Sequence, residues 1–172
     1  MSSHMNEAST LRQIRLILLL FVVALFISGA TAIPLRFELR ILDSIAGEGT
    51  SIARIWPSLA RWVTRVRDAL EELTDKHPFV AYGYDWLAFG HFAIAVIFLG
   101  AVRDPVRNRW IVEAGMIACA LVVPYAIVFG QIRGIPIFWR AIDTVFGIVG
   151  FIPLWYVRRK LVRLEASQGT FK

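Results

Sequence analysis

The first candidates for chemistry in this sequence are two charged residues inside a long apolar segment. Arg140 and Asp143 are the only charged residues within 135–157. A charge at membrane depth costs at least ~2.5–3.5 kcal/mol, so such a residue is rarely idle and seldom faces lipid. Because the two are three positions apart, they share one face of a helix. Gly147 and Gly150 continue close to that face and would let another helix approach. The stretch predicts a helical membrane protein with a polar site near one surface.

Further polar residues are expected at a similar depth on neighbouring helices. At ~1.5 Å per helical residue, His91 lies roughly 9 Å beyond Asp85, and Tyr125 is about as far from Gln131. The predicted site comprises Asp85, His91, Tyr125, Gln131, Arg133, Arg140 and Asp143. An arginine offers bidentate donors to phosphate or carboxylate, and a histidine can pass a proton that a carboxylate orients. We therefore expect His91 and Asp143 to handle protons and the other five to bind an anionic substrate.

Each member of this set also has a purely structural interpretation. His91 on an apolar helix could simply hydrogen-bond a neighbouring helix, and Arg140 with Asp143 could form a buried ion pair. Arg133 could anchor the chain at lipid phosphates. Tyr125 could belong to the belt of aromatic residues at the membrane surface.

Metal and cofactor chemistry find little support, and we predict neither. His77 and His91 do not form an HxxxH or HExxH pattern, although a haem held by both is an alternative. Cys119, the only cysteine, lies in an apolar run and is expected to serve in packing. No GxSxG, P-loop or dinucleotide fingerprint occurs in its required context.

Composition indicates the elements that must position these residues. The 172 residues are 57% hydrophobic with a mean hydropathy of +0.60, too apolar for an ordinary soluble domain. The predicted fold is an all-α integral membrane bundle forming a single membrane domain. Its four transmembrane helices are expected at 16–33, 86–102, 110–129 and 136–157. The first could alternatively be a signal peptide ending near Ser28–Ala32, but its length favours a retained span.

The segment 34–84 is the one long stretch between spans. Within it, Leu59, Trp62, Val66, Leu70 and Leu73 recur at three- and four-residue steps. This period predicts an amphipathic helix over about 57–73, beginning at Pro57. Its tryptophan and arginine content suits a helix lying at the headgroups, although it could instead cover the bundle. Residues 36–44 could be a short helix or an extended segment, and 46–51 is a predicted turn.

Charge placement predicts the orientation. The net charge is +6, and its positive residues flank the apolar blocks rather than forming one basic patch, which argues against nucleic-acid binding. Three basic segments, at 12–15, 103–109 and 158–163, fall on one side when four spans alternate. Both termini are then cytoplasmic in a bacterial inner membrane, and the segment 34–84 faces outward.

The order of several of these residues resembles the VanZ-like family of small bacterial membrane proteins. The resemblance covers about Asp85 to Phe151 and uses Asp85, His91, Gln131, Arg140, Asp143, Gly147 and Gly150. The chain departs from the family pattern at Val128, where an acid is expected, and at Gly147, where an asparagine is expected. The resemblance implies an envelope protein linked to glycopeptide resistance.

Two main functional hypotheses follow. In the first, the protein binds an anionic envelope lipid or lipid-linked precursor at an outward-facing polar pocket. In the second, it is a non-enzymatic structural or accessory subunit whose polar residues specify helix packing and whose amphipathic helix docks a partner membrane protein. A small transporter is a third, weaker hypothesis, because no inverted repeat is visible. Whether the protein is an enzyme stays open at this point.

Overall fold

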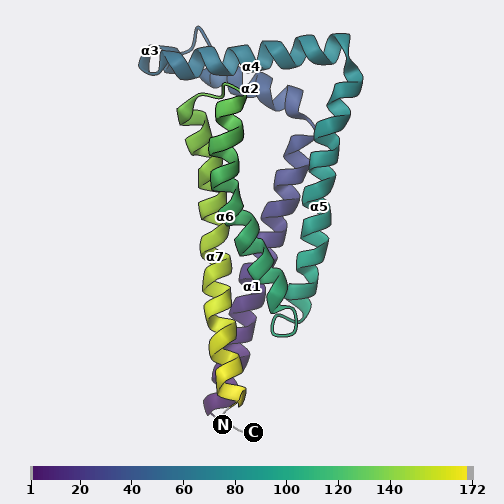
Figure 1. Ribbon diagram of the computed structural model, residues 1–172, viewed down its shortest axis with the longest axis vertical. Coiled ribbons are helices and arrows are strands. Elements are labelled where there is room, and N and C mark those ends of the chain that lie inside the picture. The colour runs from purple at the N-terminus through teal and green to yellow at the C-terminus, as the bar shows by residue number, and fades with distance from the viewer. Residues whose placement is uncertain (1, 170–172) are drawn as a thin grey trace. The chain divides into compact units, whose positions relative to one another are not determined.

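The fold consists of helices and the turns that join them in residues 2–169, which a computed structural model describes (Figure 1). The elements are α1 (Ser2–Ala32), α2 (Leu35–Ala46), α3 (Ser51–Ile55), α4 (Pro57–Lys76), the 3-10 turn η1 (Pro78–Ala81), α5 (Tyr82–Arg103), α6 (Arg109–Ile132) and α7 (Ile137–Gly169). No strand occurs in this part of the chain, so the predicted all-α fold class is confirmed.

Four of these helices are long and apolar enough to cross a membrane. They supply candidate spans at Glu7–Ala32, Pro78–Arg103, Arg109–Ile132 and Ile137–Ala166. Each contains one predicted span almost completely. The helices extend beyond the apolar runs, because the polar and basic residues that flank these runs are also helical. The chain thus has the features of a multi-pass membrane protein.

Contacts divide the chain into two compact units. Unit 1 contains the chain up to Ala24 and from Ala95 onward, and unit 2 contains Leu25–Ile94. Helices α1 and α5 therefore contribute one part to each unit. The two units are described separately below.

The core of unit 1 gathers side chains from all four spanning helices. These are Ile14, Leu18 and Val22 of α1, Ala95, Phe98 and Ala101 of α5, Val112 of α6, and Leu154, Val157, Leu161 and Leu164 of α7. No polar or charged side chain among the described residues is buried. The start of α1 and the end of α7 lie at the same end of unit 1 (Figure 1).

Ion pairs tie that end together. Glu113 accepts a hydrogen bond from Arg158 at 3.0 Å and pairs with Arg109 at 3.3 Å, and Arg109 also pairs with Glu165. The pair of Glu113 with Arg109 joins residues four positions apart on α6. Separately, Arg15 donates a hydrogen bond to the carbonyl oxygen of Arg103, and Lys160 donates one to Gln13. The three basic segments of the sequence are therefore neighbours within unit 1.

Helices α6 and α7 approach each other closely through glycine. A Cβ atom at Gly147 would lie 2.6 Å from the carbonyl oxygen of Cys119, and one at Gly150 would lie 2.8 Å from its Sγ. Real Cβ atoms do not approach this closely, so only glycine permits this separation. The predicted roles of both glycines and of Cys119 in packing are confirmed.

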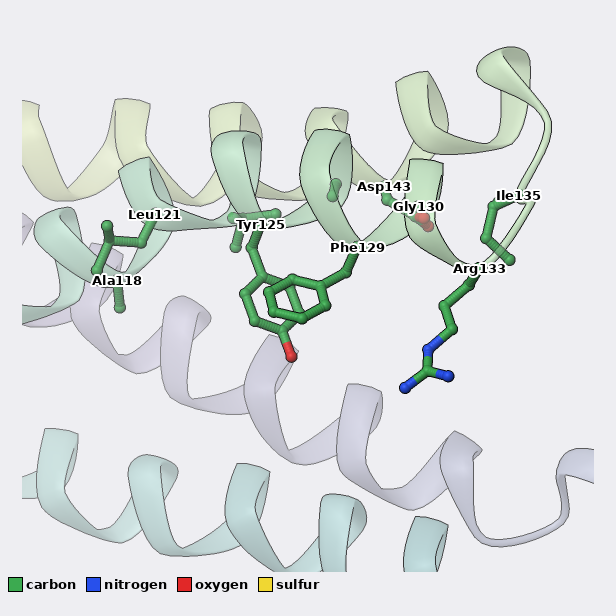
Figure 2. Close-up of a pocket in the computed structure, with 10 residues that line it drawn as sticks. Ala118, Leu121, Tyr125, Phe129, Gly130, Arg133, Ile135 and Asp143 are labelled. Carbon is green, nitrogen blue, oxygen red and sulfur yellow. The ribbon is translucent and has the colours of Figure 1, made fainter.

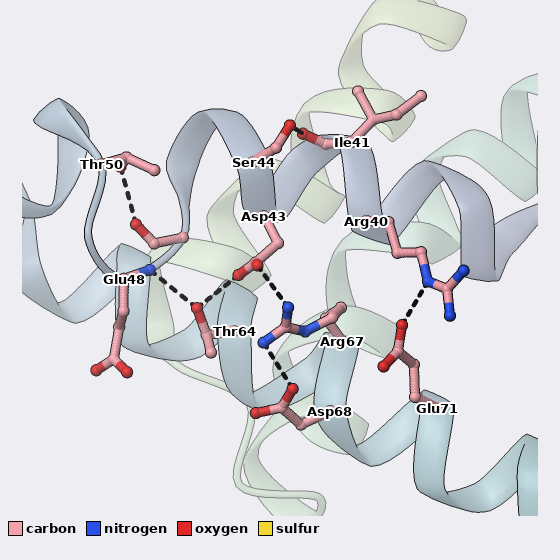
Figure 3. A network of polar contacts seen from close by, with 11 residues as sticks. Arg40, Ile41, Asp43, Ser44, Glu48, Thr50, Thr64, Arg67, Asp68 and Glu71 are labelled. Atoms are coloured by element: carbon pink, nitrogen blue, oxygen red, sulfur yellow. Dashed lines mark hydrogen bonds and ion pairs between the residues drawn. The ribbon is translucent and has the colours of Figure 1, made fainter.

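In unit 2, α2 and α4 lie antiparallel and are joined by ionic contacts (Figure 3). From one end of the pair to the other, Arg36 binds Asp75, Arg40 binds Glu71, and Arg67 binds Asp43. The hydrogen bond from Arg40 holds the pKa of the Glu71 carboxyl below its usual value. The α4 helix begins at Pro57 as predicted. Residues 35–46 form a helix because pairing with α4 supplies ionic partners for the charged side chains on one face of α2.

The turn between these two helices forms where the sequence places it. Gly49 adopts a φ of +87°, which side-chain-bearing residues rarely adopt. Thr50 follows it, and its hydroxyl accepts a hydrogen bond from the amide of Ala53 to cap α3.

The close approach of α6 and α7 leads to a stability prediction. Gly147→Ala should lower the free energy of unfolding by about 1–3 kcal/mol, because the new methyl group forces the two backbones apart. The measurement is unfolding in detergent, followed by circular dichroism during SDS titration.

The matched control is Gly90→Ala in α5, where an added Cβ meets no atom within 4 Å. This variant should be neutral or slightly stabilising, because alanine favours helix more than glycine does. Equal losses in the two variants would refute the close approach.

Candidate functional site

Three side chains follow one face of α6 at four-residue intervals. Tyr125, Phe129 and Arg133 point to the same side of the helix (Figure 2). The two aromatic rings pack with their centroids 4.4 Å apart and their planes tilted by 33°. Together they form an aromatic wall that leads to a guanidinium group.

This face of α6 borders an open groove of about 610 Å³. The groove is lined by Ala118, Leu121, Val122, Tyr125, Ala126, Phe129 and Gly130 of α6, by Arg133 and Ile135 of the following turn, and by Asp143 of α7. Ala118 and Arg133, which line its two ends along α6, are fifteen positions apart, which corresponds to ~22 Å along a helix. The lining is apolar except for one hydroxyl, one guanidinium and one carboxyl group.

Arg133 stands at the end of the groove, where α6 gives way to the turn into α7. It is the C-cap residue of α6, and Gly134 follows it with a φ of +68° that reverses the chain. Its side chain is exposed, extends away from the helix (Figure 2), and has no hydrogen bond or ion pair with a described residue. A cation at this position also complements the negative end of the helix dipole. Its donors are nevertheless available to an external anion.

Asp143 reaches the groove from α7 and is partly buried. Within unit 1 its carboxylate has no hydrogen-bond or ion-pair partner among the described residues. The structure therefore does not contain the buried Arg140–Asp143 ion pair that the sequence left open as an alternative. The physical reason is that a shared helix face does not bring two side chains together when one of them is held elsewhere.

Arg140 is held against the end of α6. Its Nη1 donates a hydrogen bond of 2.9 Å to Oε1 of Gln131, another residue of the predicted site. Its aliphatic stem lies on Gly130, where a Cβ atom would come 2.3 Å from Cδ of the arginine. The Nε atom is buried without a partner. Arg140 thus joins α7 to α6, while Gly130 separates it from the groove.

The remaining predicted site residues, Asp85 and His91, belong to unit 2. His91 shares a hydrogen bond of 2.9 Å through Nδ1 with the carbonyl oxygen of Leu87 on its own helix. Asp85 is exposed in the first turn of α5. The helix begins three residues before Asp85, at Tyr82, because the turn η1 runs directly into α5.

No cluster suited to a metal is present in the described part of the chain. No group of three or more histidine, cysteine, aspartate or glutamate residues gathers there. His77 caps the end of α4 and packs against Phe79, with ring centroids 5.8 Å apart, while His91 bonds to its own helix. These positions give no support to a haem held by both histidines.

The sequence interpretation missed seven lining residues of the groove: Phe129, Gly130 and Ile135, and the aliphatic residues Ala118, Leu121, Val122 and Ala126. The four-residue spacing of Tyr125, Phe129 and Arg133 was an available signal for the first. Nothing in the sequence pattern indicates that Gly130 receives the stem of Arg140, because that contact depends on the register between α6 and α7.

Comparison with known proteins adds no relative to this description. The chain matches no protein family model, no curated protein and no solved structure at a significant level. The functional interpretation therefore depends on the geometry of the chain itself.

The arrangement of Asp143 and Arg140 leads to a second stability prediction. Asp143→Asn should change the free energy of unfolding by less than about 1 kcal/mol, because no partner is lost. Breaking a buried ion pair would instead cost ~3–5 kcal/mol. Gly130→Ala should cost about 1–3 kcal/mol, because the methyl group displaces the stem of Arg140. Unfolding in SDS measures both, and a larger loss in Asp143→Asn than in Gly130→Ala would contradict the geometry.

Proposed function

We propose that this protein is a bacterial envelope membrane protein that binds an anionic lipid or a lipid-linked precursor in the α6 groove. The observation that carries the proposal is the groove itself. It combines an apolar channel along a spanning helix with an unpaired guanidinium at one end. This is the distribution of chemistry in a lipid phosphate, which has an apolar chain and an anionic head.

The dimensions of the groove support a chain that lies along the helix. Its length of ~22 Å exceeds the depth of one leaflet, since the hydrocarbon core of a bilayer is ~30 Å thick in total. Small side chains at Ala118 and Ala126 leave space for the chain, and the Tyr125 and Phe129 rings give it a flat wall. A long-chain lipid would therefore be favoured over a short amphiphile.

The roles that this proposal assigns to the residues differ from the roles expected from the sequence. Arg133 binds the phosphate with its free donors, and the Tyr125 hydroxyl offers a further polar contact along the groove. Asp143 disfavours a second negative charge deeper in the groove and so directs the anionic head toward Arg133. Arg140 and Gln131 fix the end of α6 against α7. The proposal is for binding and includes no chemical step at His91 or Asp143.

The proposed location is the inner membrane, with the groove opening toward the outer leaflet and both termini in the cytoplasm. Support comes from the three basic segments, which are neighbours within unit 1, at the end opposite to Arg133 along α6. This orientation agrees with an envelope role of the kind that the resemblance to VanZ-like proteins implies.

An accessory role in a membrane complex is the second candidate, and one observation favours it. Arg140 bonds to Gln131 and packs on Gly130, so the most conspicuous intramembrane charge serves helix packing. Under this alternative the groove receives a helix of a partner membrane protein. Lipid bound by the purified protein separates the two candidates.

Lipid retention gives the direct test. Arg133→Gln should reduce co-purified anionic lipid at least several-fold, because the lost guanidinium is the only cation lining the groove. Ala126→Trp should have the same effect by filling the apolar channel. Both are measured by native mass spectrometry and phosphate analysis after reconstitution with phosphatidylglycerol and phosphatidylethanolamine.

Two controls match these variants. Arg107→Gln removes an exposed cation from the α5–α6 loop, and Val128→Trp adds bulk to α6 outside the groove. Neither should change lipid retention. If Arg133→Gln alone lowers retention, Arg133 is a surface anchor; if neither variant does, the groove does not hold lipid.

The orientation has its own test in a cysteine-free Cys119→Ala background. Ser58→Cys in α4 should react with a membrane-impermeant maleimide in intact cells. Ser9→Cys in α1 should react only after permeabilisation, because positive residues follow it at the first span. Labelling of Ser9→Cys in intact cells would reverse the topology.

A further inference from the structure

Helix α2 exposes a row of large apolar side chains that no described helix of unit 2 covers. Phe37, Ile41 and Ile45 occur at four-residue steps and are 64%, 45% and 59% exposed. Four-residue spacing places them in one row along the helix. Such a row is costly in water, so its surroundings in the native environment require an explanation.

Helix α4 cannot supply the cover, because it already occupies another side of α2. Arg36, Arg40 and Asp43 of α2 bind Asp75, Glu71 and Arg67 of α4, respectively. Figure 3 shows Ile41 on the opposite side of α2 from these contacts. The ionic contacts thus fix which way the apolar row faces relative to α4.

Chain connectivity places this row beside a membrane. The spanning helix α1 ends at Ala32 and α2 begins at Leu35, so the link reaches at most ~10 Å. At the other end, α4 ends at Lys76 and only the short turn η1 separates it from α5, the next span. A helix pair tied to spans at both ends cannot move far from the bilayer surface.

Helix α4 has a stripe of exposed charged side chains. Arg61, Arg65, Asp68 and Glu72 recur at three- and four-residue steps on α4 and are all exposed. The α2–α4 pair therefore has a charged side suited to water and an apolar row suited to lipid. This combination is typical of helices that lie in the plane of a membrane interface.

We propose that α2 is an interfacial helix, with Phe37, Ile41 and Ile45 embedded among the lipids of the leaflet that α1 leaves. The ionic contacts to α4 then hold the charged face of α4 toward water. The sequence assigned the interfacial role to the 57–73 helix. In this proposal α2 contacts the lipid, and α4 packs against α2. This inference is independent of the α6 groove.

Spin labelling of the full-length protein tests the proposal. In the Cys119→Ala background, nitroxides are attached to Ile41→Cys and Ile45→Cys, and to Arg61→Cys and Arg65→Cys as water-facing controls on α4. The protein is reconstituted at high dilution into vesicles of phosphatidylethanolamine and phosphatidylglycerol. Collision rates with oxygen, which enriches in lipid, and with a water-soluble nickel chelate report the environment of each label.

Labels on α2 should collide several-fold more with oxygen than with nickel, and the two α4 labels should show the reverse. Nickel collisions at Ile41→Cys equal to those at Arg65→Cys would mean that the row faces water. Low collision with both reagents would mean that protein covers the row, and spin–spin broadening that grows with protein density would identify a second copy. Each of these last outcomes overturns the proposal.

Discussion

The close approach of α6 and α7 is the constraint on which the rest of unit 1 depends. Gly147 brings the two backbones together at Cys119, and Gly130 receives the stem of Arg140 nearer the turn. Two contacts separated along the helix pair fix both the distance and the register. With the register fixed, the Tyr125 face of α6 is left open as a groove, and Asp143 of α7 lines the same groove. A larger side chain at Gly147 would alter the groove without touching its lining.

The charged residues of unit 1 are stabilised in three different ways, and the differences separate structure from function. Glu113, Arg109, Arg158 and Glu165 neutralise one another at the end where four helices meet. Arg140 has no carboxylate partner among the described residues. Instead, Gln131 accepts its hydrogen bond and Gly130 accommodates its aliphatic stem. The guanidinium of Arg133 has no hydrogen-bond or ion-pair partner among the described residues and stands at the end of an apolar groove. An unpaired charge beside an unfilled apolar channel is what a ligand with an anionic head requires.

Unit 2 uses charge for a different purpose. The α2–α4 pair is held by three arginine–carboxylate contacts along its length. The two more exposed ones, Arg36–Asp75 and Arg40–Glu71, contribute little stability individually. Their regular order matters more, because a shift of one helical turn would separate every pair. These ionic contacts therefore determine which face of α2 is turned away from α4, and the short links to α1 and α5 keep the helix pair near the ends of two candidate spans.

The sequence by itself determined the features that depend on neighbouring residues. The four spans follow from apolar runs, and the helix beginning at Pro57 follows from a 3.6-residue period. The turns at Gly49 and Gly134 form at positions where the sequence has glycines and the backbone needs positive φ. The Glu113–Arg109 ion pair follows from the four-residue spacing of the two residues on one helix.

Only the tertiary structure decided which arginine is paired and which is free. Arg133 and Arg140 are equivalent in the sequence as cations near the same surface. The register between α6 and α7 gives Gln131 to Arg140 and leaves Arg133 at the groove. It also leaves Asp143 without the partner that its spacing predicts. Residues 35–46 likewise became helical through pairing with α4, since their own pattern was ambiguous. Contacts between distant segments depend on the separation and register of helices, which a single sequence does not encode locally.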